Sequence, residues 1–178
     1  MAKRLEWYII AKPYEELSEE ELKLIVSYWK ETKIPGIRET AMPSLGGRII
    51  FAFILNGKPA AITLAERRGN ELYLVIGSSK NIVAKARINP EIMAFYRKHR
   101  KTPNQLVFER ILEYAEQHRL KLVAEWPNTD AMRSLMRMRR ERIIDFEIPP
   151  EWKESRKYNN EPIKPRWVEI KPLKHRRR

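Results

Sequence analysis

The stretch RKHRKTPNQLVFERILEYAEQHRLKLVAEWPNTDAMRSLMRMRRER, residues 97–142, decides the fold expected for this chain. It begins with a basic run and continues into a capped helix, because Thr102 is a good N-cap, Pro103 suits the first helical position and Gln105 completes a capping box. Apolar side chains recur at helical spacing. They are Val107, Ile111, Tyr114 and His118, widened by Leu106, Phe108 and Ala115. So broad an apolar side predicts a helix packed against a sheet.

A strand and a second helix complete this stretch. The run from Leu120 to Trp126 predicts a short buried strand that ends at Pro127. Asn128 and Thr129 are candidate caps for the second helix. The predicted inward side of that helix is Ala131, Met132, Leu135, Met136 and Met138.

Upstream, the pattern changes to strands. We expect a strand over residues 5–11, then a helix that starts with a capping box of Ser18 and Glu21. Residues 48–55 and 59–66 predict two strands joined by the hairpin signal Asn56-Gly57. A turn at residues 67–70 leads to a third strand over 71–77. The Pro- and Gly-containing loop 34–47 is a candidate to line a pocket.

The predicted order of elements resembles that of the GNAT superfamily of N-acetyltransferases: a strand, a helix, three antiparallel strands, and then helix, strand and helix. The Asn128-x-x-Ala131 spacing is similar to the start of that family's last helix. The resemblance implies an α/β (α+β) fold, a GNAT-like mixed, mostly antiparallel central sheet flanked by helices, with a basic C-terminal extension. We expect a GNAT-like domain over 1–148, with an insertion at about 78–101, and the extension over 149–178.

The same resemblance implies acetyl-CoA or a related acyl-CoA as cofactor. The expected cofactor-binding residues are His99, Arg100, Lys101, Thr102, Asn104 and Asn128. The first five precede or open a helix, whose N–H groups and dipole favour anions. The family's Gln/Arg-x-x-Gly-x-Gly/Ala pattern is degenerate here, because the aligned run HRKTPN contains no glycine. The family's catalytic tyrosine position is Leu135 in this chain. The chain therefore resembles a divergent member of the family, with a degenerate acyl-CoA-binding motif.

Catalytic residues are not identified by any motif. An acyltransferase needs a general base near its acceptor amine. The weak candidates lie at or near predicted strand ends or on the first helix of the opening stretch: Glu66, Glu71, Tyr73, Glu125 and Tyr114.

Charge favours an anionic partner. Lys and Arg number 36 against 23 Asp and Glu, a net charge of +13, which suits nucleic acid, a CoA-type ligand or an acidic protein. The alternative function is a non-catalytic GNAT-like domain, of the kind a mobile element or virus encodes, that binds nucleic acid through its basic insertion, its arginine-rich helix and its tail. The candidate nucleic-acid contacts are Lys98, Arg133, Arg137, Arg140, Arg176, Arg177 and Arg178.

The insertion and the tail each allow more than one interpretation. The insertion has a predicted short helix from Pro90, and it is a substrate lid, a nucleic-acid contact or a cover for exposed sheet. The tail alternates aromatic and basic residues, and it either tracks a phosphate backbone or docks as a strand through Trp152 and Trp167 with a basic end.

Composition excludes several site classes. The chain has no cysteine, so disulfides, thiol nucleophiles and zinc-thiolate sites are ruled out. Its three histidines show no ligand spacing, so no metal is expected. No run reaches the roughly 18 apolar residues of a membrane span and there is no signal core, so we expect an intracellular, cytoplasmic protein with no membrane partner. Dense charge of both signs resembles thermophile composition.

Overall fold

A computed structural model describes residues 4–31, 45–79, 90–125, 129–148 and 167–173 of the chain. The chain divides into two compact units, each treated separately below. The first comprises Met1–Glu66 and Ile76–Tyr114, and the second comprises Arg67–Val75 and Ala115–Arg178. Within the described residues, no helix is long and apolar enough to cross a membrane.

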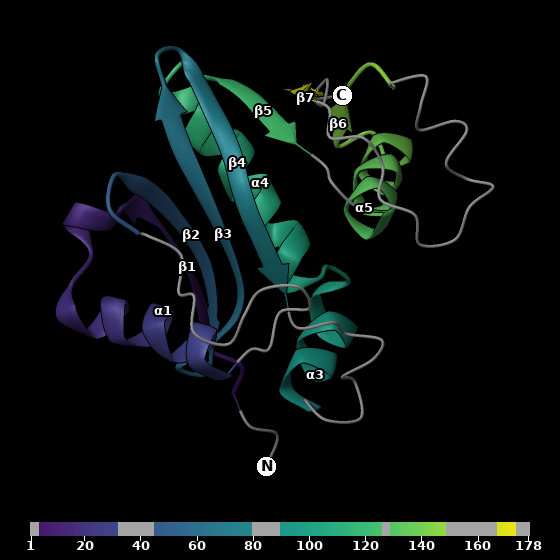
Figure 1. Cartoon of the computed structure of the whole chain (residues 1–178). Coiled ribbons are helices and arrows are strands. Elements are labelled where there is room, and N and C mark those ends of the chain that lie inside the picture. The colour runs from purple at the N-terminus through teal and green to yellow at the C-terminus, as the bar shows by residue number, and fades with distance from the viewer. Residues whose placement is uncertain (1–3, 32–44, 80–89, 126–128, 149–166, 174–178) are drawn as a thin grey trace. The chain divides into compact units, whose positions relative to one another are not determined.

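The described elements confirm the mixed α/β architecture expected from the sequence (Figure 1). The strands are joined in the order β1-β2-β3-β4-β5-β7-β6. Their bounds are β1 Trp7–Pro13, β2 Arg48–Leu55, β3 Lys58–Arg68, β4 Glu71–Ser79, β5 Lys121–Glu125, β6 Ile144–Asp145 and β7 Trp167–Pro172. The described helices are the 3-10 turn η1 Tyr14–Glu16 and the α-helices α1 Glu19–Glu31, α3 Pro90–His99, α4 Pro103–Gln117 and α5 Thr129–Arg140.

The first unit is built on an antiparallel β1–β2–β3 meander. The β2–β3 hairpin has Asn56 at φ 48° and Gly57 at φ 76°, the left-handed pair that a two-residue type I′ turn requires. The Asn56 side chain also accepts a hydrogen bond from the Glu6 N–H, at 2.9 Å. The predicted hairpin is confirmed. The predicted β1 bounds were wrong by two residues, because Lys12 and Pro13 still pair with β2.

The two faces of this meander carry different layers, because strand side chains alternate. On one face, Ile50, Ala52 and Ile54 of β2 pack with Ile25 and Tyr28 of α1. On the other face, Phe51 meets Tyr114 of α4 edge-on with ring centroids 5.3 Å apart, and Phe53 meets Phe95 of α3 at 5.0 Å. The meander is thus sandwiched between α1 and the α3–α4 pair.

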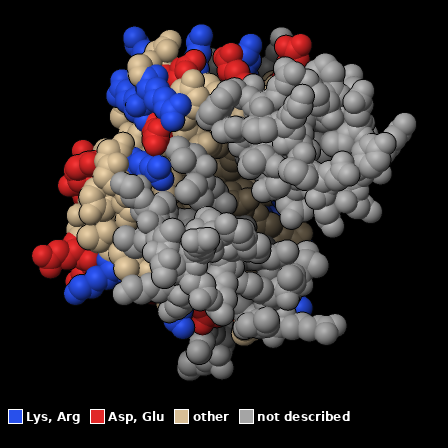
Figure 2. Space-filling model, in the orientation of Figure 1, with Lys and Arg blue, Asp and Glu red and all other residues tan. Residues whose placement is uncertain are grey.

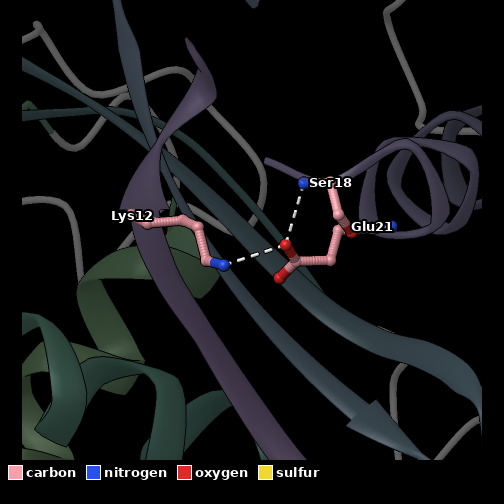
Figure 3. Close-up of polar contacts among 3 residues, drawn as sticks. All are labelled: Lys12, Ser18 and Glu21. Atoms are coloured by element: carbon pink, nitrogen blue, oxygen red, sulfur yellow. Dashed lines mark hydrogen bonds and ion pairs between the residues drawn. The ribbon is translucent and has the colours of Figure 1, made fainter. Parts of the chain in front are cut away.

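Helix α1 starts with the capping box that the sequence predicted. The Glu21 N–H donates to Ser18 Oγ at 3.1 Å, and the Ser18 N–H donates to Glu21 Oε1 at 3.0 Å. Lys12 of β1 donates to the same Glu21 oxygen at 2.8 Å (Figure 3). The cap of α1 is therefore also its attachment to the edge strand.

The insertion contains the predicted helix, α3, which buries Ile92 and Phe95. Because Phe95 packs on Phe53, the helix covers sheet that would otherwise be exposed, which is the third of the interpretations considered above. Residues 80–89 of the insertion, and residues 34–44 of the predicted pocket loop, lie outside the described residues.

The second unit pairs the start of β4 with β5 in parallel, Glu71 to Leu74 against Lys121 to Ala124. Strand β7 pairs antiparallel with β5 and with β6. Since β7 is Trp167–Pro172, part of the predicted extension docks as a strand. It buries Val168 and Ile170.

Each of the helices α3, α4 and α5 is followed, within two residues, by an arginine in the left-handed region, a position that usually favours glycine. Arg100, Arg119 and Arg142 have φ of 58°, 52° and 57°. After α4, the Leu120 N–H bonds the Ala115 carbonyl and the Arg119 N–H bonds that of Glu116, a Schellman motif. The prediction that His118 lies on the apolar side of α4 was wrong. The helix ends at Gln117, and the Schellman turn leaves His118 exposed.

Candidate functional site

The turn between α3 and α4 carries five of the six predicted cofactor residues. Arg100 closes α3 by donating its N–H to the Tyr96 carbonyl at 2.8 Å, and α4 begins three residues later at Pro103. The basic run Arg97 to Lys101 therefore spans the last turn of α3 and the connection. Arg97, Lys98 and Arg100 are exposed, whereas His99 and Lys101 are half-buried. The turn is a compact set of cations ahead of a helix N-terminus, within the first unit.

The start of α4 is already capped from inside the chain. The Gln105 N–H donates to Thr102 Oγ1 at 3.1 Å, and the Leu106 N–H donates to the Thr102 carbonyl at 3.1 Å. Pro103 has no N–H to donate. Among the described residues, this leaves the Asn104 N–H as the backbone donor of the first helical turn that an external anion can use. A helix N-terminus normally offers several such donors.

Two of the predicted cofactor residues are held by neighbours in the fold. Lys101 Nζ lies 3.0 Å and 3.1 Å from the two carboxylate oxygens of Glu109, a residue of α4. The imidazole of His99 lies in ring contact with Phe95, at a centroid distance of 4.4 Å, and with Trp7, at 5.9 Å. Among the described residues, no ion pair involves Lys98 or Arg100. Together with the exposed Arg97, these two side chains carry the charge that remains available at the turn.

Asn128 lies outside the described residues, so the sixth predicted cofactor residue stays a prediction.

Glu66 lies near the end of β3 in a half-buried ion pair. Its carboxylate is 3.4 Å from Arg48 Nε, on the neighbouring strand. The Arg48 Nη1 atom is buried, and among the described residues it has no hydrogen-bond partner. Sequence reasoning did not single out Arg48. The only sequence signal was its place at the start of a strand paired with the strand that bears Glu66.

Glu71 and Tyr73 come together at the start of β4, in the second unit. The hydrogen bond to Glu71 raises the pKa of Tyr73, with smaller contributions from burial and from the Glu71 charge, although Arg68 acts in the opposite direction. The Arg68 guanidinium lies 4.4 Å from the centre of the Tyr73 ring. A phenol with a raised pKa stays protonated near neutral pH, so it cannot accept a proton from an amine.

The other two catalytic candidates contribute less. Tyr114 is buried in α4 against Phe51, so it belongs to the core of the first unit. Glu125 ends β5, and its side chain is outside the described set.

The candidate nucleic-acid residues are described in part. Lys98, Arg137 and Arg140 are exposed, and Arg137 lies 4.0 Å from Glu141. The side chain of Arg133 and residues 176–178 are outside the described set. On the face shown in Figure 2, the described Lys and Arg side chains lie among Asp and Glu side chains. Arg139 is held by Asp145 and by the Phe146 carbonyl, each 3.2 Å from its Nε. Within the described residues, no group of three or more His, Asp or Glu is placed to hold a metal.

No protein-family profile and no curated protein sequence matches this chain. Solved structures do match it. The ribosomal-protein-S18-alanine N-acetyltransferase of Escherichia coli aligns over 96% of each chain with a TM-score of 0.55 and 11% identity. An acyl-CoA N-acyltransferase of Pseudomonas aeruginosa aligns over 95% of this chain and 99% of its own, with a TM-score of 0.50 and 13% identity. Likeness at these identities shows the fold alone, and it confirms the GNAT fold that the sequence resembles.

Proposed function

We propose that this chain is an N-acyltransferase that binds the phosphates of acetyl-CoA or a related acyl-CoA at the α3–α4 turn. The observation that carries the proposal is the exposed cationic turn before the N-terminus of α4, in a chain whose fold is that of GNAT acyltransferases. The two matched enzymes are described as an N-acetyltransferase and an acyl-CoA N-acyltransferase. The same fold and a phosphate-compatible turn in one chain favour this class of ligand.

The residues at the turn fit phosphate through side-chain charge. The Asn104 N–H and the dipole of α4 supply one backbone donor and a favourable field. Arg100 adds a planar guanidinium, which binds phosphate through two parallel hydrogen bonds. Lys98 adds a second exposed cation. Charge on these side chains thus takes the place of the glycine-supported backbone donors that the sequence lacks.

The bound acyl-CoA would supply the activated thioester. The protein must then remove a proton from the acceptor amine. Tyr73 is a poor candidate for that step because its pKa is raised. We therefore propose Glu66, which lies in the same unit as the α3–α4 turn, as the candidate for the general base.

Calorimetric titration with CoA and acetyl-CoA tests the binding step. We compare the double variant Lys98→Gln/Arg100→Gln with Lys23→Gln/Arg67→Gln, which loses the same charge at exposed positions elsewhere. Because a hydrogen bond to a charged group contributes about 1.5–3 kcal/mol, the first variant is expected to bind CoA at least about 10-fold more weakly. The second is expected to match the wild type within about twofold. Absence of CoA binding up to millimolar concentration would refute the proposal, and equal binding by both variants would place the phosphates elsewhere.

Turnover is measurable with a thiol reagent. The chain contains no cysteine, so any thiol that appears after mixing with acetyl-CoA and an amine comes from CoA. Thiol release is expected to depend on the amine and to fall in Glu66→Gln. Release that is the same with and without every amine tested contradicts acyl transfer.

A second candidate function is nucleic-acid binding, which the exposed Lys98, Arg137 and Arg140 support together with the net charge of +13. Its test is the salt dependence of binding to a labelled DNA or RNA oligonucleotide. Neutralising Z phosphates gives a slope of log K against log salt of about −0.9Z for duplex DNA and about −0.7Z for single strands. A flat salt response, or no binding at low salt, rules this candidate out.

A further inference from the structure

An aromatic cluster lies between the edge strand β1 and helix α3, within the first unit. The Trp7 indole stacks on Phe53, with ring centroids 5.5 Å apart and planes 18° apart. The Phe95 and Trp7 rings form a T-shaped contact, with ring centroids 5.7 Å apart and planes 79° apart. Phe53 and Phe95 are fully buried. The position of the indole is therefore fixed by Phe53 of β2 and by Phe95 of α3.

Trp7 itself is not buried. Its exposed fraction is 40%, although Phe53 and Phe95 are at 0%. Because Phe53 stacks on one ring face, a flat ligand would stack on the other face. A stacking surface that is already rigid loses little conformational entropy when a ligand binds.

The cluster joins directly to the cationic turn. His99, in the last turn of α3, contacts both Trp7 and Phe95 through its ring. Its sequence neighbours Lys98 and Arg100 are the exposed cations of the turn. His99 thus contacts the aromatic cluster and lies, in the sequence, between two exposed cations of the turn.

We propose that Trp7 is a stacking platform for a nucleobase whose phosphates contact Lys98 and Arg100. A nucleotide is the ligand chemistry that combines a flat aromatic ring with negative charge, and base stacking on an aromatic side chain does not require a particular base. Two sources share this chemistry: the nucleotide half of CoA, and a nucleotide of a single strand. The first source rests on the proposed acyl-CoA function, whereas the platform does not.

The variants use Tyr8 as a matched control. Tyr8 is the neighbouring residue on β1 and is 48% exposed, but it points to the opposite face of the sheet because strand side chains alternate. Trp7→Leu removes the platform, Trp7→Phe keeps a smaller aromatic face, and Tyr8→Leu removes an equally exposed aromatic residue. Near-ultraviolet circular dichroism and melting temperature report whether each variant is folded, and Trp7→Phe remains a test should Trp7→Leu unfold.

The full-length protein is titrated with 3′-phospho-ADP, CoA, phosphopantetheine and an oligothymidylate. Stacking contributes enough for its loss to weaken binding by about 5- to 150-fold. We expect that loss in Trp7→Leu for 3′-phospho-ADP or the oligonucleotide, a smaller loss in Trp7→Phe and no change in Tyr8→Leu. Quenching of tryptophan fluorescence by the base is expected in the wild type and is expected to fall in Trp7→Phe.

Each outcome has a distinct meaning. Loss of CoA and 3′-phospho-ADP binding in Trp7→Leu, with phosphopantetheine binding unchanged, supports the platform with CoA as the source. Wild-type binding of the oligonucleotide but not of CoA, lost in Trp7→Leu, supports the platform with a single strand as the source and counts against the acyl-CoA function. CoA and oligonucleotide binding that Trp7→Leu leaves unaltered overturns the platform and leaves the acyl-CoA function standing. Absence of binding by all four probes overturns both.

Discussion

The contact of Lys12 with Glu21 predicts a pH-dependent contribution to stability. Glu21 Oε1 accepts two hydrogen bonds, from Lys12 Nζ at 2.8 Å and from the Ser18 N–H at 3.0 Å (Figure 3). Its side chain is 18% exposed and that of Lys12 is 36% exposed. Glu21→Gln keeps an oxygen to accept from Ser18 but removes the charge, so the change isolates the electrostatic part of this attachment.

The expected cost of Glu21→Gln near neutral pH is about 1 kcal/mol. A partly exposed ion pair contributes about 0.2–1 kcal/mol, and a negative charge in the first turn of a helix contributes about 0.3–1 kcal/mol. For a chain of this size, 1 kcal/mol corresponds to a melting temperature lower by about 2–4 °C. Glu20→Gln is the matched control, because Glu20 is in the same first turn but exposed. Glu20→Gln is expected to lose only the stabilisation that a negative charge gains from the helix dipole.

The pH dependence follows from the pKa of Glu21. Burial raises this pKa, but the hydrogen bonds from Lys12 and Ser18 and the Lys12 charge outweigh burial, so the pKa lies below its ordinary value of 4.5. A carboxyl group with a lowered folded-state pKa stabilises the fold above its unfolded-state pKa, and this stability is lost as pH falls through the folded-state pKa. The difference between wild type and Glu21→Gln is therefore full at neutral pH and shrinks below pH 4.5.

Denaturant unfolding of wild type, Glu21→Gln and Glu20→Gln at neutral pH and at about pH 3 measures this difference. The single variant Lys12→Met and the double variant Lys12→Met/Glu21→Gln complete a double-mutant cycle, whose coupling energy is expected at about 0.2–1 kcal/mol. A Glu21→Gln cost that does not change with pH, or that equals the cost of Glu20→Gln, would falsify the reasoning.

Three further changes test other parts of the fold by denaturant or thermal unfolding. Arg119→Gly is expected to stabilise by about 0.5–1 kcal/mol, because Arg119 has a φ of 52° that glycine adopts without a Cβ penalty; a loss of stability contradicts this. Asn56→Ala is expected to cost about 1–2 kcal/mol, from its φ of 48° and its bond to the Glu6 N–H. Asn56→Gly recovers the conformational part only, so equal costs for the two would show that φ is irrelevant. Phe95→Ala is expected to cost about 3–5 kcal/mol, because Phe95 is fully buried under α3; a cost below 1 kcal/mol would mean that α3 does not cover the sheet.

Local chemistry made much of this fold predictable from the sequence. The capping box at Ser18, the N-cap bond to Thr102 and the hairpin at Asn56-Gly57 depend on groups within three residues of one another, and all three formed. The order of these elements was enough to indicate the GNAT fold. The boundary errors, at β1 and at the end of α4, fall where a strand partner or a Schellman turn sets the last residue.

The sequence predicted where the candidate site lies in the chain, but not which of its side chains are free to bind a ligand. Sequence placed a cationic run before α4, but it did not show which of the charges are already neutralised. Lys101 is bound by Glu109, and the ring of His99 is in the aromatic cluster with Trp7. The remaining charge on Lys98 and Arg100 follows from packing.

The sequence by itself determined the elements, their order and the position of the basic turn, because helix caps, turn residues and hydrophobic periodicity act over a few neighbouring residues. Tertiary structure alone decided which distant side chains meet. It brought Trp7 of β1 onto Phe53 and beside Phe95 and His99 of α3, and it added β7 to β5. Contacts of this kind depend on how whole elements bury their apolar faces against one another. A local sequence pattern does not specify which elements pack together.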